Sequence, residues 1–334
     1  MKPYMHYLFL LIVTLAIVSC ENELPFSTKD NPPKLVMNAL INADSVTNVV
    51  YLNLTGKEQV THILNATLTV HVNGKLTESL RPLPIPPNAV PQCSFTMKGK
   101  FTPEDVVRLD AFTDDGQYHA WAEVTIPRRP DNIEEIDTLT VPLTQSGYTR
   151  NHLRHKITIK DLTGEDNYYR LVMDTRVIQM KLNGNKEVIA TQTWHNYNFV
   201  SREDVVLTDG QPTTGSDEEN SMFDTTKNTY GVFNDSRFKN SIYTMTVYVP
   251  SELFRGIDPL GPFLSEQADI TVRLLSITET EYYYLRALNL ASSDAYDEML
   301  SEPIKYPSNV HGGTGIVGAS TETSKIIHIK KTQQ

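Results

Sequence analysis

Cys20 is the residue whose surroundings point most directly to a reaction. It follows Ile17-Val18-Ser19, so a thiol stands directly behind a small residue. A thiol is the side chain that can act as a nucleophile to form a thioether. One cation, Lys2, and an apolar run over residues 7–18 precede it. Because this run is shorter than the roughly 20 residues of a membrane-spanning helix, the pattern predicts a secretory signal peptide over residues 1–19.

The segment Ile17-Val18-Ser19-Cys20 resembles the bacterial lipobox. The resemblance implies a diacylated Cys20 thiol, cleavage before Cys20 and acylation of the new amino group. Two or more acyl chains hold a protein firmly on a membrane, whereas one chain binds only marginally. The alternative is an uncleaved anchor that carries a chance cysteine.

Residues 20–33 predict a polar tether that prolines stiffen. Glu21 and Glu23 lie just behind Cys20 and resemble the signal that sends many Bacteroidota lipoproteins to the outer face of the outer membrane. We therefore expect a lipid-anchored protein exposed at the cell surface. An inner-leaflet or periplasmic location is the alternative.

Other side chains that could do chemistry lack the spacing that chemistry needs. The sequence has no Gly-x-Ser-x-Gly, His-Glu-x-x-His or Cys-x-x-Cys motif. His152 and His155 could form a metal pair, but we expect solvated side chains in a loop that enters a strand. Residues 217–219, Asp-Glu-Glu, could bind calcium without the spacing of an EF-hand, and a solvated acidic loop is the simpler interpretation. Glu302 could act as an acid, but no second positioned group accompanies it, so we predict neither an enzyme nor a cofactor.

Composition argues against two classes of partner. The 334-residue chain has 30 basic and 40 acidic residues, a net charge of −10, which disfavours nucleic acid and anionic membrane surfaces. After cleavage Cys93 has no second free cysteine beside it, so no internal disulfide is expected. We predict that Cys93 is a small buried hydrophobe.

Residues 34–129 predict an N-terminal immunoglobulin-like β-sandwich. Residues 66–72 alternate large apolar with small or polar side chains and end on Asn73-Gly74, a type I′ hairpin signal. Asp114-Asp115-Gly116 predicts a second hairpin turn between two apolar runs. Further strands are expected over residues 35–41, 49–54, 106–112 and 119–126. A proline-rich loop, 82–91, must lie at a sheet edge or end.

Residues 130–334 predict a larger β-rich domain, an antiparallel sandwich or a partly closed barrel with a helical pair. The segment Pro127-Arg128-Arg129-Pro130 interrupts the strand pattern, and we place the boundary between the two domains at this segment. Helical spacing over about 279–300 predicts one helix and then a short second one. Strands are expected over 154–160, 168–181, 186–197, 230–233, 243–249 and 270–276, followed by two closing strands at 316–317 and 326–329. The tyrosine runs 168–169 and 282–284 could offer a stacking surface, but we expect alternate rings to fill the core.

The segment 302–319 is the most distinctive in the chain. It reads Glu-Pro-Ile-Lys-Tyr-Pro-Ser-Asn-Val-His-Gly-Gly-Thr-Gly-Ile-Val-Gly-Ala. Its glycines permit positive φ or a close approach between backbones. A phosphate-binding loop is disfavoured, because no Lys-Ser/Thr pair follows and the next element is predicted to be a strand.

This segment resembles the C-terminal signature of a large family of Bacteroidota outer-membrane lipoproteins classed as a domain of unknown function. The matching residues are Glu302, Pro303, Ser308, Asn309, Gly312, Gly313, Gly315 and Gly318. Val317 departs from the expected aromatic residue and Thr314 from the expected larger aliphatic one. The resemblance implies a companion of TonB-dependent transporters and assigns no reaction, so we expect the signature to be structural.

Three functions remain open. The first is a lipid-anchored outer-membrane accessory of a TonB-dependent transporter, which binds a small-molecule, glycan or peptide cargo or docks on the transporter. The second is a structural or adhesive surface lipoprotein. The third is a surface hydrolase whose site is assembled from distant residues, with Glu302 as its acid.

Overall fold

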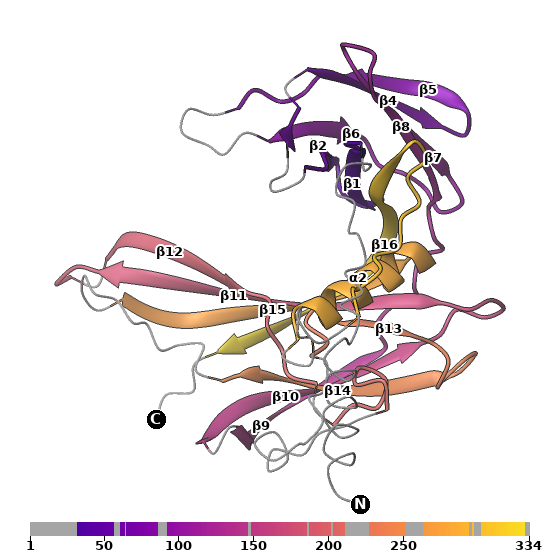
Figure 1. The fold of residues 1–334 in the computed structure, drawn as a ribbon. Helices are drawn as coiled ribbons and strands as arrows, with labels where there is room; N and C mark the ends of the chain where they lie inside the picture. The colour runs from indigo at the N-terminus through magenta and orange to yellow at the C-terminus, as the bar shows by residue number, and fades with distance from the viewer. Residues whose placement is uncertain are drawn as a thin grey trace, which may run out of the picture. The chain divides into compact units, whose positions relative to one another are not determined.

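The described part of the chain consists of strands and one helix, α2 (Figure 1). The computed structural model describes residues 32–56, 61–63, 65–85, 92–145, 148–185, 187–201, 203–210, 227–251, 263–293, 296 and 302–330. The elements are β1 Leu35–Asn42, β2 Thr47–Leu54, β3 Thr61–His62, β4 Ala66–Val72, β5 Lys75–Leu80, β6 Cys93–Lys98, β7 Val106–Thr113, β8 His119–Thr125, β9 Glu135–Gln145, β10 Tyr148–Lys160, β11 Tyr168–Leu182, β12 Val188–Asn196, β13 Val232–Asn234, β14 Ile242–Pro250, β15 Phe263–Ile277, α2 Glu279–Ala291 and β16 Gly313–Lys330. The prediction of a mainly β fold is confirmed.

Three sheets organise these strands. The largest has the order β12-β11-β15-β16-β1-β2-β3, with β13 paired to β11 and β6 paired to β2. A second sheet has the order β5-β4-β7-β8, and a third has β14-β10-β9. Each smaller sheet contributes to a hydrophobic core together with part of the large one.

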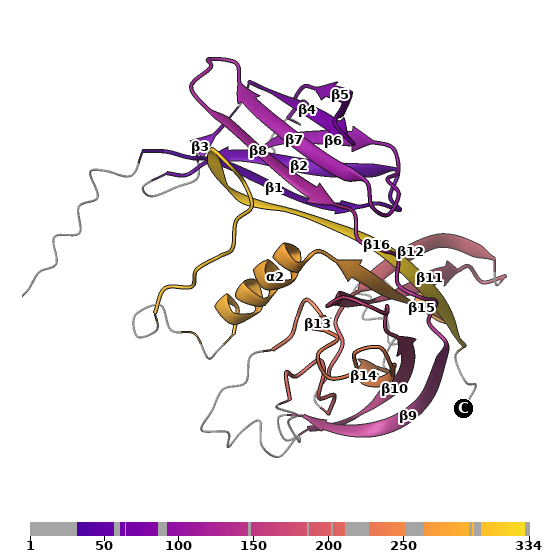
Figure 2. The same ribbon diagram turned by 90° about the vertical axis from the view of Figure 1, so that its right-hand side faces the viewer.

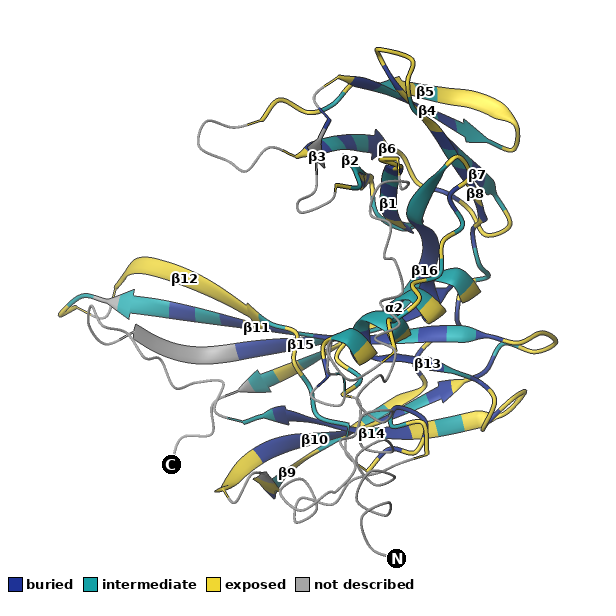
Figure 3. Ribbon diagram, viewed as in Figure 1, coloured by how far each residue is buried: buried dark blue, intermediate teal, exposed yellow. Residues whose placement is uncertain are grey.

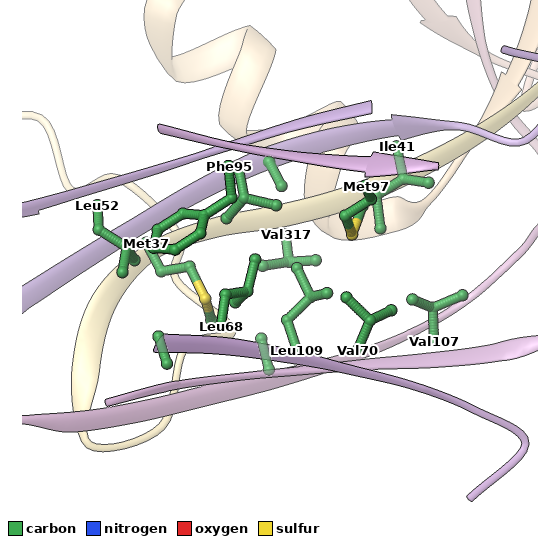
Figure 4. Close-up of a cluster of buried hydrophobic side chains, with 14 of the residues drawn as sticks. Met37, Ile41, Leu52, Leu68, Val70, Phe95, Met97, Val107, Leu109 and Val317 are labelled. Atoms are coloured by element: carbon green, nitrogen blue, oxygen red, sulfur yellow. The ribbon is translucent and has the colours of Figure 1, made fainter. Parts of the chain in front are cut away.

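The first core lies between the sheet β5-β4-β7-β8 and the strands β6, β2 and β1. Alternation at period two in β1, β4 and β6 places one set of side chains inside, because successive residues of a strand point to opposite faces. Met37, Phe95 and Leu109 are fully buried there, and Val317 from β16 packs among them (Figure 4). The Asn73-Gly74 turn has φ of 51° and 76°, as the predicted type I′ hairpin requires.

Strand β16 joins the two halves of the large sheet. Residues 313–320 pair in parallel with β1, and residues 320–330 pair antiparallel with β15. Ser320 is opposite Asn42 on one side and Ile277 on the other. The two closing strands predicted from the sequence are therefore one continuous strand, because Ser320-Thr321-Glu322 exchanges one strand partner for another without leaving the sheet.

The second core is formed by the sheet β14-β10-β9 and the strands β11, β15 and β13. Tyr169, Phe233 and Met245 are fully buried in it. Strand β9 pairs only with β10, which places Pro142 on an edge strand where its missing N–H costs little. By contrast β12, at one end of the large sheet, is exposed along nearly its whole length (Figure 3).

Helix α2 packs against β16, β11 and β13 (Figure 2). Its buried residues are Glu281, Tyr282, Leu285 and Asn289. Tyr282 and Leu285 enter a third apolar cluster with Ile277. Residues 294, 295 and 297–300, where a second helix is predicted, lie outside the described residues.

Residues 34–334 form one compact unit, and of the preceding unit, 1–33, only residues 32 and 33 are described. The first core draws on residues 35–126 and the second on residues from Ile133 onward, so the predicted boundary at 129 falls between them. However, Val310, Val317 and Ala319 from the C-terminal end complete the first core. The domain boundary itself stays a prediction. No described helix is long and apolar enough to cross a membrane.

Candidate functional site

The signature segment begins at the surface and becomes buried as it enters β16. Glu302, Pro303 and Ser308 are exposed, Asn309 is half-buried and Val310 is buried. Glu302 is therefore a solvent-exposed carboxyl group at the start of the described segment 302–330.

Asn309 fixes the segment onto β16 through its side-chain amide. Nδ2 donates to the Val317 carbonyl at 2.8 Å, and the Val317 N–H donates to Oδ1 at 2.9 Å. The asparagine side chain thus supplies the pair of hydrogen bonds that a neighbouring strand would supply.

The four glycines of the signature lie where a side chain would collide with another backbone or with a buried group. A Cβ at Gly312 would come within 2.5 Å of the His119 carbonyl oxygen, and one at Gly313 within 2.3 Å of the Leu35 carbonyl oxygen. At Gly315, where φ is +116°, a Cβ would lie 2.2 Å from the Met37 carbonyl oxygen. These contacts account for glycine at each position by close approach of β16 to β1 and β8.

Gly318 differs from the other three because its neighbour is a side chain on α2. A Cβ there would lie 2.5 Å from the Glu281 carboxylate and 3.0 Å from Leu40 Cδ2. Glu281 is 2% exposed, and burial raises its pKa to about 8 despite the charge of Arg170.

His311 links the signature to the outer face of the sheet β5-β4-β7-β8. Its backbone makes two hydrogen bonds with Trp121 on β8, N–H to carbonyl in each direction, at 2.8 and 3.0 Å. The two rings stack with centroids 4.1 Å apart, and the Arg108 guanidinium lies 4.1 Å from the Trp121 ring centroid. A cation against an indole face is a favourable contact.

Around this stack is a patch that we call the β7–β8 face, formed by His71, Arg108, Asp110, Phe112, His119, Trp121 and His311. Phe112 is 42% exposed and stacks on His119 with centroids 4.3 Å apart and an interplanar angle of 3°. Asp110 accepts two hydrogen bonds from Arg108, at 2.8 and 3.0 Å, which lower its pKa against the effect of burial. The face thus combines exposed rings with a fixed ion pair, a combination suited to binding sugars or peptides.

A second polar group crosses the large sheet. His195 on β12, Arg176 on β11, Asp269 on β15 and His328 on β16 are directly opposite neighbours on successive strands. Asp269 contacts Arg176 at 2.8 Å and His328 Nδ1 at 2.7 Å. His195 Nδ1 lies 2.9 Å from Asp174. Both histidines are held through Nδ1, and the side chains of His195 and His328 are 42% and 65% exposed. No local pattern in the sequence predicts this row, because the row depends on the register of four strands.

The expectation of solvated side chains for the histidine pair of β10 is wrong. His152 and His155 both lie within β10 and are buried, at 5% and 0% exposure. Three residues apart on a strand, they point to opposite faces and cannot share an ion. His155 Nδ1 lies 2.8 Å from Thr138 Oγ1, and burial lowers its pKa to about 4. Over the described residues, no three His, Cys, Asp or Glu side chains are grouped to hold a metal.

Three further predictions can be compared with the structure. Cys93 is buried at 2% exposure, as expected of a small hydrophobe. Tyr169 and Tyr282 are buried, which confirms that alternate rings of the tyrosine runs fill the core, whereas Tyr283 is 48% exposed. Cys20 and the acidic loop at 217–219 lie outside the described residues.

These features define a class of protein: a mainly β chain in which one C-terminal strand, held by an asparagine and four glycines, joins the two halves of one large sheet. The chain belongs to the family described as "Domain of unknown function (DUF4249)", whose model matches residues 21–326. No curated protein matches the sequence.

Proposed function

We propose that this protein is a lipid-anchored, non-enzymatic binding protein of the outer membrane that assists a TonB-dependent transporter. The observation that carries the proposal is Cys20, which follows a signal-like apolar run directly. The family match begins at residue 21, immediately after the expected site of cleavage and lipidation. This start supports a mature chain that begins at Cys20.

The role of the β sandwich in this proposal is to hold cargo or to dock on the transporter. The β7–β8 face supports it, because Phe112 and His119 offer stacked rings at the surface beside the Arg108–Asp110 pair. Small-molecule, glycan or peptide cargo would each find stacking and hydrogen-bonding groups there. Bacteroidota origin and exposure on the outer leaflet are part of the same proposal.

Anchoring is tested by metabolic labelling with a fatty acid and by membrane fractionation. Cys20→Ser should abolish label, since no thioether can form. Cys93→Ser is the matched control and should remain labelled and membrane-bound. Label retained by the Cys20→Ser variant would remove the basis of the proposal.

Partnership is tested by detergent extraction of a tagged chain. We expect a large outer-membrane barrel protein to co-purify with the wild type, and protease shaving of intact cells to cleave the tagged chain. Recovery of the tagged protein alone, in repeated extractions, would contradict the transporter role.

Binding through the β7–β8 face is tested with Phe112→Ser. The ring is 42% exposed, so the fold should persist while retention of cargo or partner falls. Val49→Ser, at 36% exposure on β2 of the opposite sheet, is the control and should bind normally.

An adhesive surface protein is the second candidate, favoured by the same exposed face. It predicts specific binding to a host or matrix protein with no small-molecule ligand. Loss of that binding in Phe112→Ser, with the transporter absent from the extract, would replace the first proposal by the second.

A further inference from the structure

Helix α2 carries two acidic side chains in its first turn, and their surroundings differ. Glu279 is exposed and accepts a hydrogen bond from the Tyr168 hydroxyl at 2.8 Å. Glu281 is buried, and its Oε2 has no hydrogen-bond partner. A buried carboxylate without a partner is costly in its charged form, whereas the neutral acid costs much less.

The carboxyl of Glu281 lies over Gly318, at the place where β16 passes from β1 to β15. A Cβ at Gly318 would lie 2.5 Å from Oε2 and 2.8 Å from the Glu281 Cβ, so only glycine leaves room for this contact. Thr278, the residue before the helix, also forms hydrogen bonds with β16 near Gly318. The Thr278 N–H donates to the Ala319 carbonyl at 3.1 Å, and the Ala319 N–H donates to Thr278 Oγ1 at 3.4 Å.

The charged groups on the neighbouring elements do little to stabilise a negative charge on the buried Glu281 carboxylate. Arg170 on β11 is the one charge that lowers its pKa, and the Arg170 Nε–H is committed to the Tyr230 carbonyl at 3.1 Å. On β15, Arg273 is paired with Glu322 of β16. Strand β1 and the described strand β13 contain no ionisable side chain.

Three further ionisable groups of α2, Arg286, Tyr282 and Tyr284, are not among the charges that shift the pKa of Glu281. Arg286 contacts Asp209 at 2.7 Å and the Tyr282 hydroxyl at 3.0 Å. Tyr282 and Tyr284 are neutral at physiological pH, since burial raises the pKa of each. Burial of Glu281 is therefore the dominant influence on its proton.

We propose that the seat of α2 on β16 is a proton-controlled contact, in which the docked helix holds Glu281 protonated and the undocked helix releases that proton. Acid therefore tightens docking, and rising pH loosens it. The undocked state frees Thr278 from Ala319 and separates Tyr282 and Leu285 from Ile277. The inference does not depend on the proposed transporter role.

The direction and range follow from linkage. The pKa is about 8 when docked, against an ordinary value of 4.5. Because the docked state binds one more proton between these values, the undocking equilibrium should rise up to tenfold per pH unit from about pH 5 to about pH 8. Above about pH 8 both states are deprotonated, and the curve should become flat.

Hydrogen exchange of the mature full-length protein measures this directly. Exchange of the α2 amides, compared between wild type and Glu281→Gln at each pH, cancels the intrinsic pH dependence of exchange. We expect the ratio of the wild-type exchange rate to the Glu281→Gln exchange rate to rise from about pH 5 to about pH 8. The protection of the α2 amides in Glu281→Gln, relative to free-peptide rates, should not depend on pH. Glu279→Gln, on the same helix turn but exposed, is the control and should follow the wild type. A wild-type slope that persists in Glu281→Gln would overturn the proposal.

A second measurement does not require the variant to fold. Wild-type protein labelled with ¹³C at the glutamate carboxyl should show one glutamate still protonated at pH 7, titrating near pH 8. A spectrum in which every glutamate is ionised at pH 7 would equally overturn the proposal.

Discussion

The side-chain amide of Asn309 bonds both backbone polar groups of Val317, eight residues further along the chain. Val317 is fully buried in the first core, while its backbone is fixed by a residue that precedes the strand. The turn between them, His311 to Gly313, is held to β8 by the His311–Trp121 backbone pair. The C-terminal segment is thus a closed loop that locks the last strand into the first core.

Asn309→Ala should therefore destabilise the first core. It removes two hydrogen bonds and leaves two backbone groups without partners, a loss of about 2 kcal/mol. The chain has two tryptophans, so in a Trp194→Phe background the fluorescence of Trp121 reports this core during urea unfolding. Ser308→Ala, whose exposed hydroxyl accepts one long hydrogen bond of 3.3 Å, should change the unfolding midpoint little. Equal midpoints for the two variants would argue against the lock.

Gly315→Ala should be among the most destabilising single-methyl additions in the chain. Its φ of +116° is unfavourable for any L side chain, and the added Cβ would lie 2.2 Å from the Met37 carbonyl oxygen. We expect a loss of at least about 2 kcal/mol in the free energy of unfolding. Gly184→Ala, in a turn with no atom within 4 Å of its Cβ, should stay within about 0.5 kcal/mol of the wild type. Similar losses at both positions would contradict the close approach of β16 to β1.

The sequence predicted most of the strands because period-two alternation survives wherever one face of a strand is buried. The strand β6 was missed although Cys93, Phe95 and Met97 alternate with polar residues, because the proline-rich loop before it obscured the signal. Strand β9 was missed for a physical reason. It is an edge strand of largely polar residues around Pro142, so it has no continuous apolar face.

The long-range relationships could not be read from the sequence. The parallel pairing of β1 with β16 joins residues about 280 apart, and nothing local encodes it. The glycines of the signature indicated that β16 approaches another backbone closely, but they did not indicate which carbonyl oxygen each glycine faces. Glu281 lies within the helix predicted over about 279–300, but helical spacing does not show that its carboxyl is buried against Gly318. The row from His195 to His328 needs the register of four strands.

Asp44→Asn should weaken the junction between β1, the 127–130 segment and β16. Asp44 receives two hydrogen bonds from Arg129 and one from the Glu322 N–H, at 2.9 Å, and these lower its pKa against the opposing effect of burial. Arg129 is partly exposed, so we expect a loss of about 1 kcal/mol at pH 7.

The effect of Asp44→Asn should vanish in acid. A carboxyl whose folded pKa is lowered stabilises the protein above its unfolded pKa of 3.8, and this contribution is lost as the pH falls through the folded value. Urea unfolding at pH 7 and at pH 3 should therefore show the variant and the wild type converging at the lower pH. Asp114→Asn, which breaks the exposed pair with Arg81, is the control and should have little effect at either pH. A constant difference at all pH values would show that Asp44 acts through packing alone.

Cys93 should react slowly with thiol reagents while the protein is folded. Burial raises the pKa of its thiol to about 11 from the ordinary 9.0, so at pH 8 the thiolate is roughly 100-fold scarcer than in the unfolded chain. The side chain is also enclosed in the first core, at 2% exposure.

In a Cys20→Ser background Cys93 is the remaining cysteine, and the rate of its alkylation can be followed by mass spectrometry with and without urea. We expect at least a 100-fold faster reaction in urea, and addition of Asn309→Ala should accelerate the native reaction because it loosens the same core. Equal rates in folded and unfolded protein would mean that Cys93 is accessible, and its placement between the two sheets would be wrong.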